Sequence, residues 1–139
     1  MKKSDHIDAL KQVPLFQGLS DRELGSIARD VREEPYSAGQ DIVVEGGAAT
    51  GFFMVVEGRA TILKNGKTLR KLGPGSYFGE MALFDRSPRA ATVHAETQVK
   101  TLVLSPQNFA AVLADNWTVT AKVLAVLSGR IRALDDEIV

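Results

Sequence analysis

The chain has 139 residues, 45% of them hydrophobic and 24% charged, which is the composition of a single globular domain that can bury a core. Seventeen basic and seventeen acidic residues cancel, so the overall charge gives no sign of binding to nucleic acid or to an anionic membrane. Because there is no cysteine, disulfides and thiolate metal sites are excluded.

The sequence gives no sign of a membrane segment or a signal peptide. Apolar runs such as residues 52–56 are far too short to span a bilayer. Lys2 and Lys3 are not followed by the apolar stretch that a signal peptide requires. We therefore expect a cytoplasmic protein without membrane contact.

The first 33 residues are predicted to be helical. A short helix over residues 4–12 is stopped by Pro14. A second helix is predicted from Asp21 to about Arg32, because Ser20 and Glu23 form a capping box. Apolar residues follow that box at helical spacing: Leu24, Ile27, Ala28 and Val31.

Residues 34–104 have the pattern of short strands joined by tight turns. Nine of the twelve glycines lie between positions 39 and 79. Asn65-Gly66 is the preferred two-residue turn of a β-hairpin. Runs rich in Val, Ile, Phe and Thr predict strands at residues 41–45, 52–57, 59–64, 92–96 and 100–104. Strands at this spacing favour a sandwich or a jelly-roll barrel.

Two helices are predicted in residues 105–139. Ser105-Pro106 begins the first, and a longer one extends from about Trp117 to Asp136. The longer helix has two apolar lines, one of them heptad-like: Thr120, Leu124, Leu127, Ile131, Leu134 and Ile138, beside Val119, Val123 and Val126. One line must cover the strands. The other is either core as well or a surface for a partner, for instance a second copy of the chain.

Residues 78–93 combine features of a small anion site. Glycines at 73, 75 and 79 let backbone N–H groups approach a ligand. Arg89 can bind phosphate oxygens with two parallel hydrogen bonds. The Glu80 carboxylate can accept a hydrogen bond from a sugar hydroxyl. The alternative is that Glu80 and Arg89 simply pair with each other across a loop.

The order of residues in this stretch is more specific than its chemistry. Phe-Gly-Glu-Met-Ala-Leu, four residues, and then Pro-Arg-Ala-Ala-Thr-Val closely resembles the phosphate-binding cassette of the cyclic-nucleotide-binding domain family. The resemblance implies an eight-stranded β-roll flanked by helices, over nearly the whole chain from Leu10. It implies that Glu80 holds the ribose 2′-OH and that Arg89 pairs with the cyclic phosphate. The full set of expected ligand-binding residues is Phe78, Gly79, Glu80, Met81, Ala82, Arg89, Ala90 and Ala91.

The resemblance also suggests how the base is bound. In the family, a residue late in the C-terminal helix lies over the purine; here the candidates are residues 130–135, with Arg130 for stacking or Leu134 as an apolar lid. A threonine after the cassette arginine often accompanies preference for guanine, but this position is Ala90. We therefore expect cyclic AMP as the ligand in preference to cyclic GMP. We expect no output domain after the roll, and therefore an unidentified downstream protein as partner.

Catalysis is not expected. A metal-dependent β-roll enzyme would need clustered histidines, and only His6 and His94 are present, so neither metal nor cofactor is predicted. The alternative to ligand binding is a degenerate roll that serves only as an interaction domain. Such a roll has usually lost the glutamate or the arginine of the cassette, whereas this chain has both, as Glu80 and Arg89. One departure from the family is the turn at residues 47–51, which lacks an acidic residue.

The sequence thus predicts one α+β, mainly β domain over residues 1–139. Its parts are a helical region (1–33), an eight-stranded β-roll (34–104) and two C-terminal helices (105–139). Its predicted function is to bind a cyclic mononucleotide as a regulatory module.

Overall fold

A computed structural model describes residues 1–48, 50–80 and 88–134 of the chain. It begins with helix α1 (Lys3–Lys11), the 3-10 turn η1 (Pro14–Phe16) and helix α2 (Asp21–Ala28). The capping box is confirmed, because the Ser20 side chain accepts from the Glu23 backbone N–H and Glu23 accepts from the Ser20 N–H.

The end predicted for the second helix is wrong. Helix α2 ends at Ala28, and strand β1 already begins at Arg32. Val31 continued the helical spacing in the sequence and does pack against the core, but it does so from the extended segment that leads into β1. Val31 is therefore partly buried because the segment before β1 passes over the core, and not because it lies on the apolar face of a helix.

The described residues contain eight strands in two four-stranded antiparallel sheets. The first sheet has the order β1-β8-β3-β6 and the second the order β2-β7-β4-β5. The strands are β1 (Arg32–Tyr36), β2 (Asp41–Val43), β3 (Phe52–Glu57), β4 (Ala60–Lys64), β5 (Lys67–Leu72), β6 (Tyr77–Phe78), β7 (Thr92–Ala95) and β8 (Val99–Leu104). The β4–β5 hairpin turn is confirmed: Asn65 and Gly66 both have positive φ, at 52° and 77°, as a type I′ turn requires.

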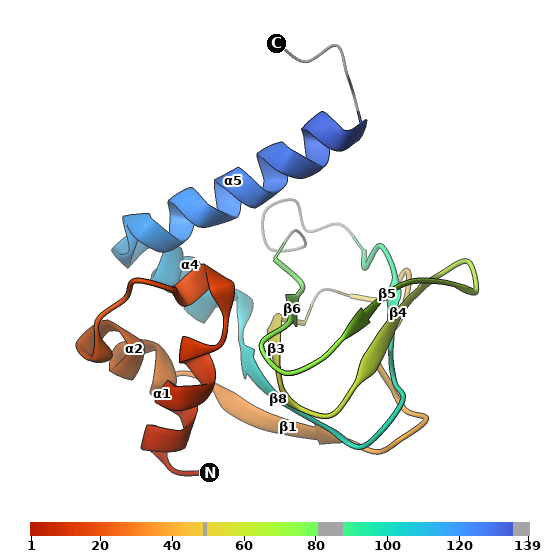
Figure 1. The fold of residues 1–139 in the computed structure, drawn as a ribbon, viewed down its shortest axis with the longest axis horizontal. Coiled ribbons are helices and arrows are strands. Elements are labelled where there is room, and N and C mark those ends of the chain that lie inside the picture. Colours follow the sequence, from red (N-terminus) through yellow and green to blue (C-terminus); the bar gives the residue numbers. More distant parts are fainter. Residues whose placement is uncertain (49, 81–87, 135–139) are drawn as a thin grey trace.

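Strand β3, an inner strand of the first sheet, is buried on both faces, which explains its continuous apolar run. Side chains alternate across a strand. Phe52 and Met54 pack with the helices, in a cluster that includes Leu10 of α1. Phe53 and Val55 face the second sheet and form the interior of the roll. The molecule therefore has three layers, with the helices, the first sheet and the second sheet in that order (Figure 1).

The C-terminal helices are α4 (Pro106–Asp115) and α5 (Trp117–Leu134). The Ser105 cap and the proline at the first helical position of α4 are confirmed. The predicted end of the longer helix, at Asp136, lies outside the described residues. The first half of α5 is anchored, because Val119 and Val123 are buried in the helix-side core. Figure 1 shows α5 lying across one end of the molecule, with its later turns beyond β6. Over the described ranges no single helix is long and apolar enough to cross a membrane, although α4 and α5 together, bent by 109°, meet that criterion of length and composition.

Candidate functional site

A cavity of about 480 Å³ opens between the two sheets, next to the start of the cassette. This volume lies in the range of small-molecule sites. Its walls come from five strands, from the segment around Arg89 and from α5. The lining residues are Val43, Ile62, Leu69, Arg70, Tyr77, Phe78, Gly79, Glu80, Pro88, Arg89, Ala90, Ala91, Val93 and Arg130.

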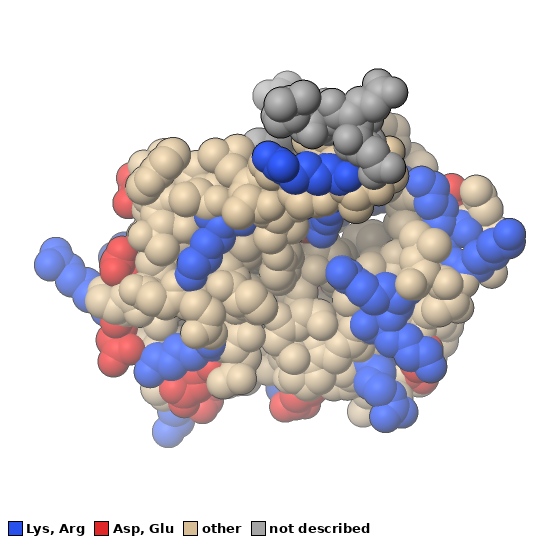
Figure 2. All heavy atoms as spheres, turned by 45° about the horizontal axis from the view of Figure 1, so that its top comes forward, with Lys and Arg blue, Asp and Glu red and all other residues tan. Residues whose placement is uncertain are grey.

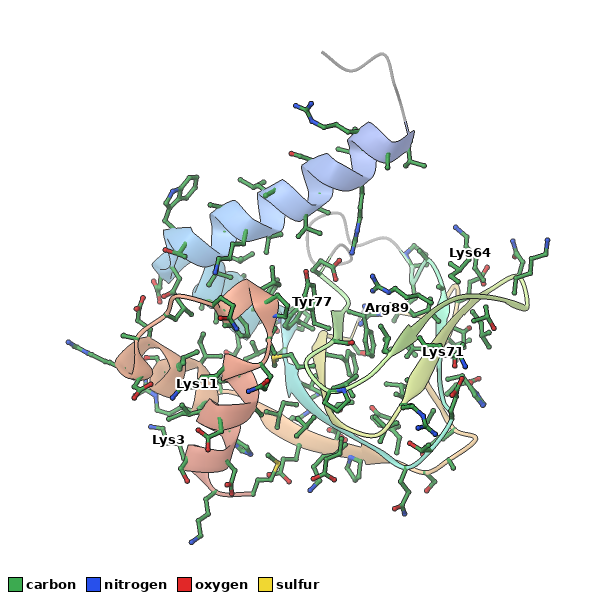
Figure 3. The ribbon with its side chains drawn as sticks, in the orientation of Figure 1. Lys3, Lys11, Lys64, Lys71, Tyr77 and Arg89 are labelled. Carbon is green, nitrogen blue, oxygen red and sulfur yellow. The ribbon has the colours of Figure 1, made fainter. Side chains whose placement is uncertain are left out.

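Arg89 is held firmly, although it is a charged residue with only 6% of its surface exposed. Its Nη2 donates to the carbonyl oxygen of Gly51 at 2.7 Å, and its guanidinium lies over the Phe53 ring, 5.7 Å from the centroid. Its backbone is fixed by two hydrogen bonds to the facing loop, from Gly46 N to Arg89 O and from Arg89 N to Gly47 O. Figure 3 shows the Arg89 side chain inside the roll.

Gly79 leaves room for this guanidinium. A Cβ at that position would lie 2.7 Å from Arg89 Nη1 and 2.6 Å from the Gly51 carbonyl oxygen, and the φ of Gly79 is +97°. Both the space and the backbone conformation therefore require glycine. The Phe78 ring beside it stacks on Phe53, with centroids 5.0 Å apart, so Phe53 contacts both Phe78 and the Arg89 guanidinium.

Glu80 is paired, but not with Arg89. Its Oε1 lies 2.7 Å from Nη1 of Arg130, which comes from α5. Glu80 is 4% exposed, whereas the Arg130 side chain is 41% exposed, so the pair joins a buried wall of the cavity to its rim. Glu80 and Arg89 are both described and form no ion pair with each other, so the simple pairing that the sequence left open is not found.

The buried positive charge of Arg89 favours an anionic ligand. Burial lowers the pKa of the Arg89 guanidinium from its ordinary value, and nearby Glu80 partly offsets this effect. Burial, and to a smaller extent Glu80, raises the pKa of the Tyr77 phenol. The Arg89 Nε is buried without a hydrogen-bond partner among the described residues. A buried cation of this kind gains most from an anion that supplies charge and acceptor atoms together.

The structure places most of the predicted site residues around the one cavity. Phe78, Gly79, Glu80, Arg89, Ala90, Ala91 and Arg130 all line it. Met81 and Ala82 lie outside the described residues. Leu134, the other candidate for the lid, does not line the cavity and is 88% exposed. His94 bonds Asp41 on a sheet face, with 2.7 Å between Nδ1 and Oδ1.

Sequence reasoning missed the walls that other strands supply. Val43, Ile62 and Val93 lie on β2, β4 and β7 and were predicted only as strand residues. Leu69 and Arg70 both line the cavity although they are consecutive. The register of β4 with β5 shifts between Ile62 and Leu63 and leaves Leu69 as an extra residue, and such a bulge redirects side chains. A hairpin motif does not reveal a bulge of this kind.

The described residues contain no group of three or more His, Asp or Glu side chains that could hold a metal ion. The chemistry that the lining offers is recognition: one buried guanidinium, one buried carboxylate, two alanines whose small side chains cover little of the backbone, and apolar walls. This combination suits a small ligand with one anionic group, hydroxyls and an apolar ring system.

Comparison with known proteins defines the class. Residues 33–116 match the family described as the cyclic nucleotide-binding domain, and the chain belongs to this family. It is 37% identical over 103 residues to a cAMP-dependent protein kinase regulatory subunit of Eremothecium gossypii, covering 73% of this chain and 22% of that protein. It is 34% identical over 130 residues to a cGMP-dependent protein kinase of Toxoplasma gondii, covering 93% of this chain and 12% of that protein.

The fold comparison agrees. The regulatory domain of Toxoplasma gondii PKA, solved as a co-crystal with cAMP, superimposes with a TM-score of 0.82 at 29% identity, covering 91% of this chain and 50% of that one. The predicted fold class, a β-roll with helices at both ends, is thereby confirmed. The chain spans only about an eighth to a quarter of the two kinase proteins above.

Proposed function

We propose that this chain binds cyclic AMP in the cavity between its sheets and acts as a cytoplasmic regulatory module, without catalysis of its own. The observation that carries the proposal is the buried Arg89 guanidinium on the cavity wall, with buried Glu80 beside it. The cAMP co-crystal of a similar regulatory domain supports the choice of ligand.

Each part of the ligand has a matching group. Arg89 pairs with the cyclic phosphate, and the backbone N–H groups of Ala90 and Ala91, which both line the cavity, donate to its oxygens. Glu80 accepts from the ribose 2′-OH. Among the described residues Arg130 contacts Oε1 of Glu80 and none contacts the second carboxylate oxygen, to which we assign this hydroxyl. The adenine ring lies against apolar walls and is covered by α5. Arg130 is the better candidate for the covering residue, because it lines the cavity and Leu134 does not.

Base selectivity is tested by parallel calorimetric titrations with cyclic AMP and cyclic GMP. We expect tighter binding of cyclic AMP, because Ala90 offers no hydroxyl to the guanine amino group. The relatives include both cAMP-dependent and cGMP-dependent kinase proteins, so either nucleotide is a reasonable ligand and the two titrations distinguish them. A lower dissociation constant for cyclic GMP would overturn the preference.

The role of Glu80 is tested with 2′-deoxy cyclic AMP. Against the parent, removal of the 2′-OH should cost about 1–3 kcal/mol, and against Glu80→Gln much less. Glu80→Gln itself should weaken cyclic AMP binding less than Arg89→Ala does. Equal losses for the two ligands in parent and variant would disprove the pairing of Glu80 with that hydroxyl.

We also propose a homodimer through α5. Trp117, Leu124 and Ile131 follow one another at intervals of seven residues, and each is more than half exposed. They lie on a different face of α5 from the buried Val119 and Val123. Sedimentation velocity should show a dimer for the parent and a monomer for Leu124→Glu; a monomeric parent at high concentration would disprove this assembly. A downstream protein is the competing partner for the same face.

A further inference from the structure

A strongly basic hairpin lies beside the cavity. Residues 58–79 hold five of the seventeen Lys and Arg residues and none of the seventeen Asp and Glu residues. The rest of the chain therefore has twelve basic against seventeen acidic residues and is net negative. The five are Arg59, Lys64, Lys67, Arg70 and Lys71, which we call the basic hairpin; all are exposed.

The basic hairpin is built around the cavity wall. Its strands β4 and β5 supply Ile62, Leu69 and Arg70 to the lining. Lys71 follows Arg70 directly. Lys64 and Lys67 are each two residues from a lining position, about 7 Å along a strand. That separation is shorter than the Debye length of about 10 Å at 0.1 M salt, so these charges act on a ligand at the cavity mouth.

Little in the described structure neutralises these charges. Among the residues that the structure describes, none of the five forms an ion pair. Glu45 and Glu96 are nearby acids. Glu45 accepts from the backbone N–H of Asn65. Glu96 accepts from the Thr61 hydroxyl, and Lys71 and Arg59 are close enough to contribute to lowering its pKa, so it offsets part of their charge. Figure 2 shows Lys and Arg side chains gathered beside a hollow in the surface, on the side of the molecule where Figure 1 places β4 and β5.

We infer that the basic hairpin steers the anionic ligand into the cavity. Charge of one sign around a concave site raises the local concentration of an oppositely charged ligand and its association rate. The other explanation for lysines here is that β5 is an edge strand, where charge discourages pairing with another chain. Edge protection predicts no effect on ligand association, so the two explanations differ in a measurable rate.

The inference rests on the proposed function, and its test separates the two. Association and dissociation rates of cyclic AMP labelled with a fluorophore at base carbon C8 are measured by stopped flow. The variant is Lys64→Gln with Lys71→Gln, neither of which lines the cavity. The matched control is Lys3→Gln with Lys11→Gln, which removes the same charge from α1; Figure 3 shows these two lysines on the opposite side of the molecule from Lys64 and Lys71.

At an ionic strength of about 0.1 M, where the Debye length of about 10 Å leaves the distant α1 lysines screened, we expect the hairpin variant to associate about threefold more slowly than the parent, with an unchanged dissociation rate. The control variant should match the parent, and all three proteins should converge at about 0.5 M. Equal association rates at the lower ionic strength, or a change in dissociation alone, would overturn steering while leaving nucleotide binding intact. If the parent itself binds no labelled nucleotide, the proposed function and this inference both fail.

Discussion

At the scale of single residues, the site depends on how closely Arg89, Gly79 and Gly51 approach one another. The guanidinium is buried because Phe53 covers one side of it and the Gly51 carbonyl accepts one of its hydrogens. Gly79 must lack a side chain for this arrangement to exist. The cassette glycine thus shapes the proposed phosphate site by making room for an arginine.

Gly79→Ala should therefore weaken both folding and binding. We expect a loss of about 2–5 kcal/mol in the free energy of unfolding, from the contact with the Gly51 carbonyl and from backbone strain. Cyclic AMP binding should fall at least about tenfold, about 1.4 kcal/mol, because Arg89 must move. Thermal unfolding and calorimetry measure the two effects.

Gly66→Ala is the matched control. Gly66 also has positive φ, but a Cβ there would meet nothing within 4 Å, so only the backbone strain of about 1 kcal/mol applies. Its binding should be unchanged. If the two variants lose the same stability and both bind normally, the close approach at Gly79 is unimportant for the site.

At the scale of elements, α5 has an anchored half and a half with few contacts. Val119 and Val123 are buried, and the Thr120 hydroxyl donates to the Leu113 carbonyl. Every described residue from Ser128 onward is exposed. The contact of Arg130 with Glu80 is the one ion pair that the described residues provide between this half and the cavity. A ligand that engages Glu80 can therefore act on α5 through a single identified contact.

Hydrogen exchange tests this coupling. Arg130→Gln should raise exchange about fivefold in peptides covering residues 124–134, because the half-buried pair contributes about 1 kcal/mol, and peptides around Val119 should not change. Arg132→Gln is the control, since Arg132 is an exposed arginine of the same helix without a described ion pair. In the parent, cyclic AMP should increase protection in the roll around Glu80 and in α5 together. Protection confined to the roll would show that α5 is not a lid.

At the scale of the whole molecule, a strand could be predicted from the sequence when it buries apolar residues. Strands β3, β4, β7 and β8 were predicted because each has a neighbour on both sides in its sheet and buries apolar residues in a regular pattern. β1, β5 and β6 were not predicted individually. They are edge strands; β1 has no buried residue and β5 has only Leu72, so neither shows apolar alternation, and β1 contains Pro35, which an edge position tolerates. The edge strand β2 was predicted because it buries Ile42 and Val43.

The site residues also fall into two groups, those that could be predicted from the sequence and those that could not. The residues from Phe78 to Ala91 are contiguous, so a motif could find them. The apolar walls, the Leu69 bulge and the Arg130 contact with Glu80 arise from segments up to 87 residues apart, joined only by the closure of the roll. Spacing along the chain does not specify which side chains such a closure brings together.

Calorimetric titration of cyclic AMP into the parent and into Arg89→Ala tests the central claim most directly. The account predicts saturable binding of one nucleotide per chain by the parent. It predicts that the variant, which leaves the phosphate without its counter-charge, loses about 2–5 kcal/mol, a decrease in affinity of about 30-fold or more. Unfolding curves must show that the variant is folded. A folded Arg89→Ala protein that binds cyclic AMP as tightly as the parent would contradict the assignment of this cavity.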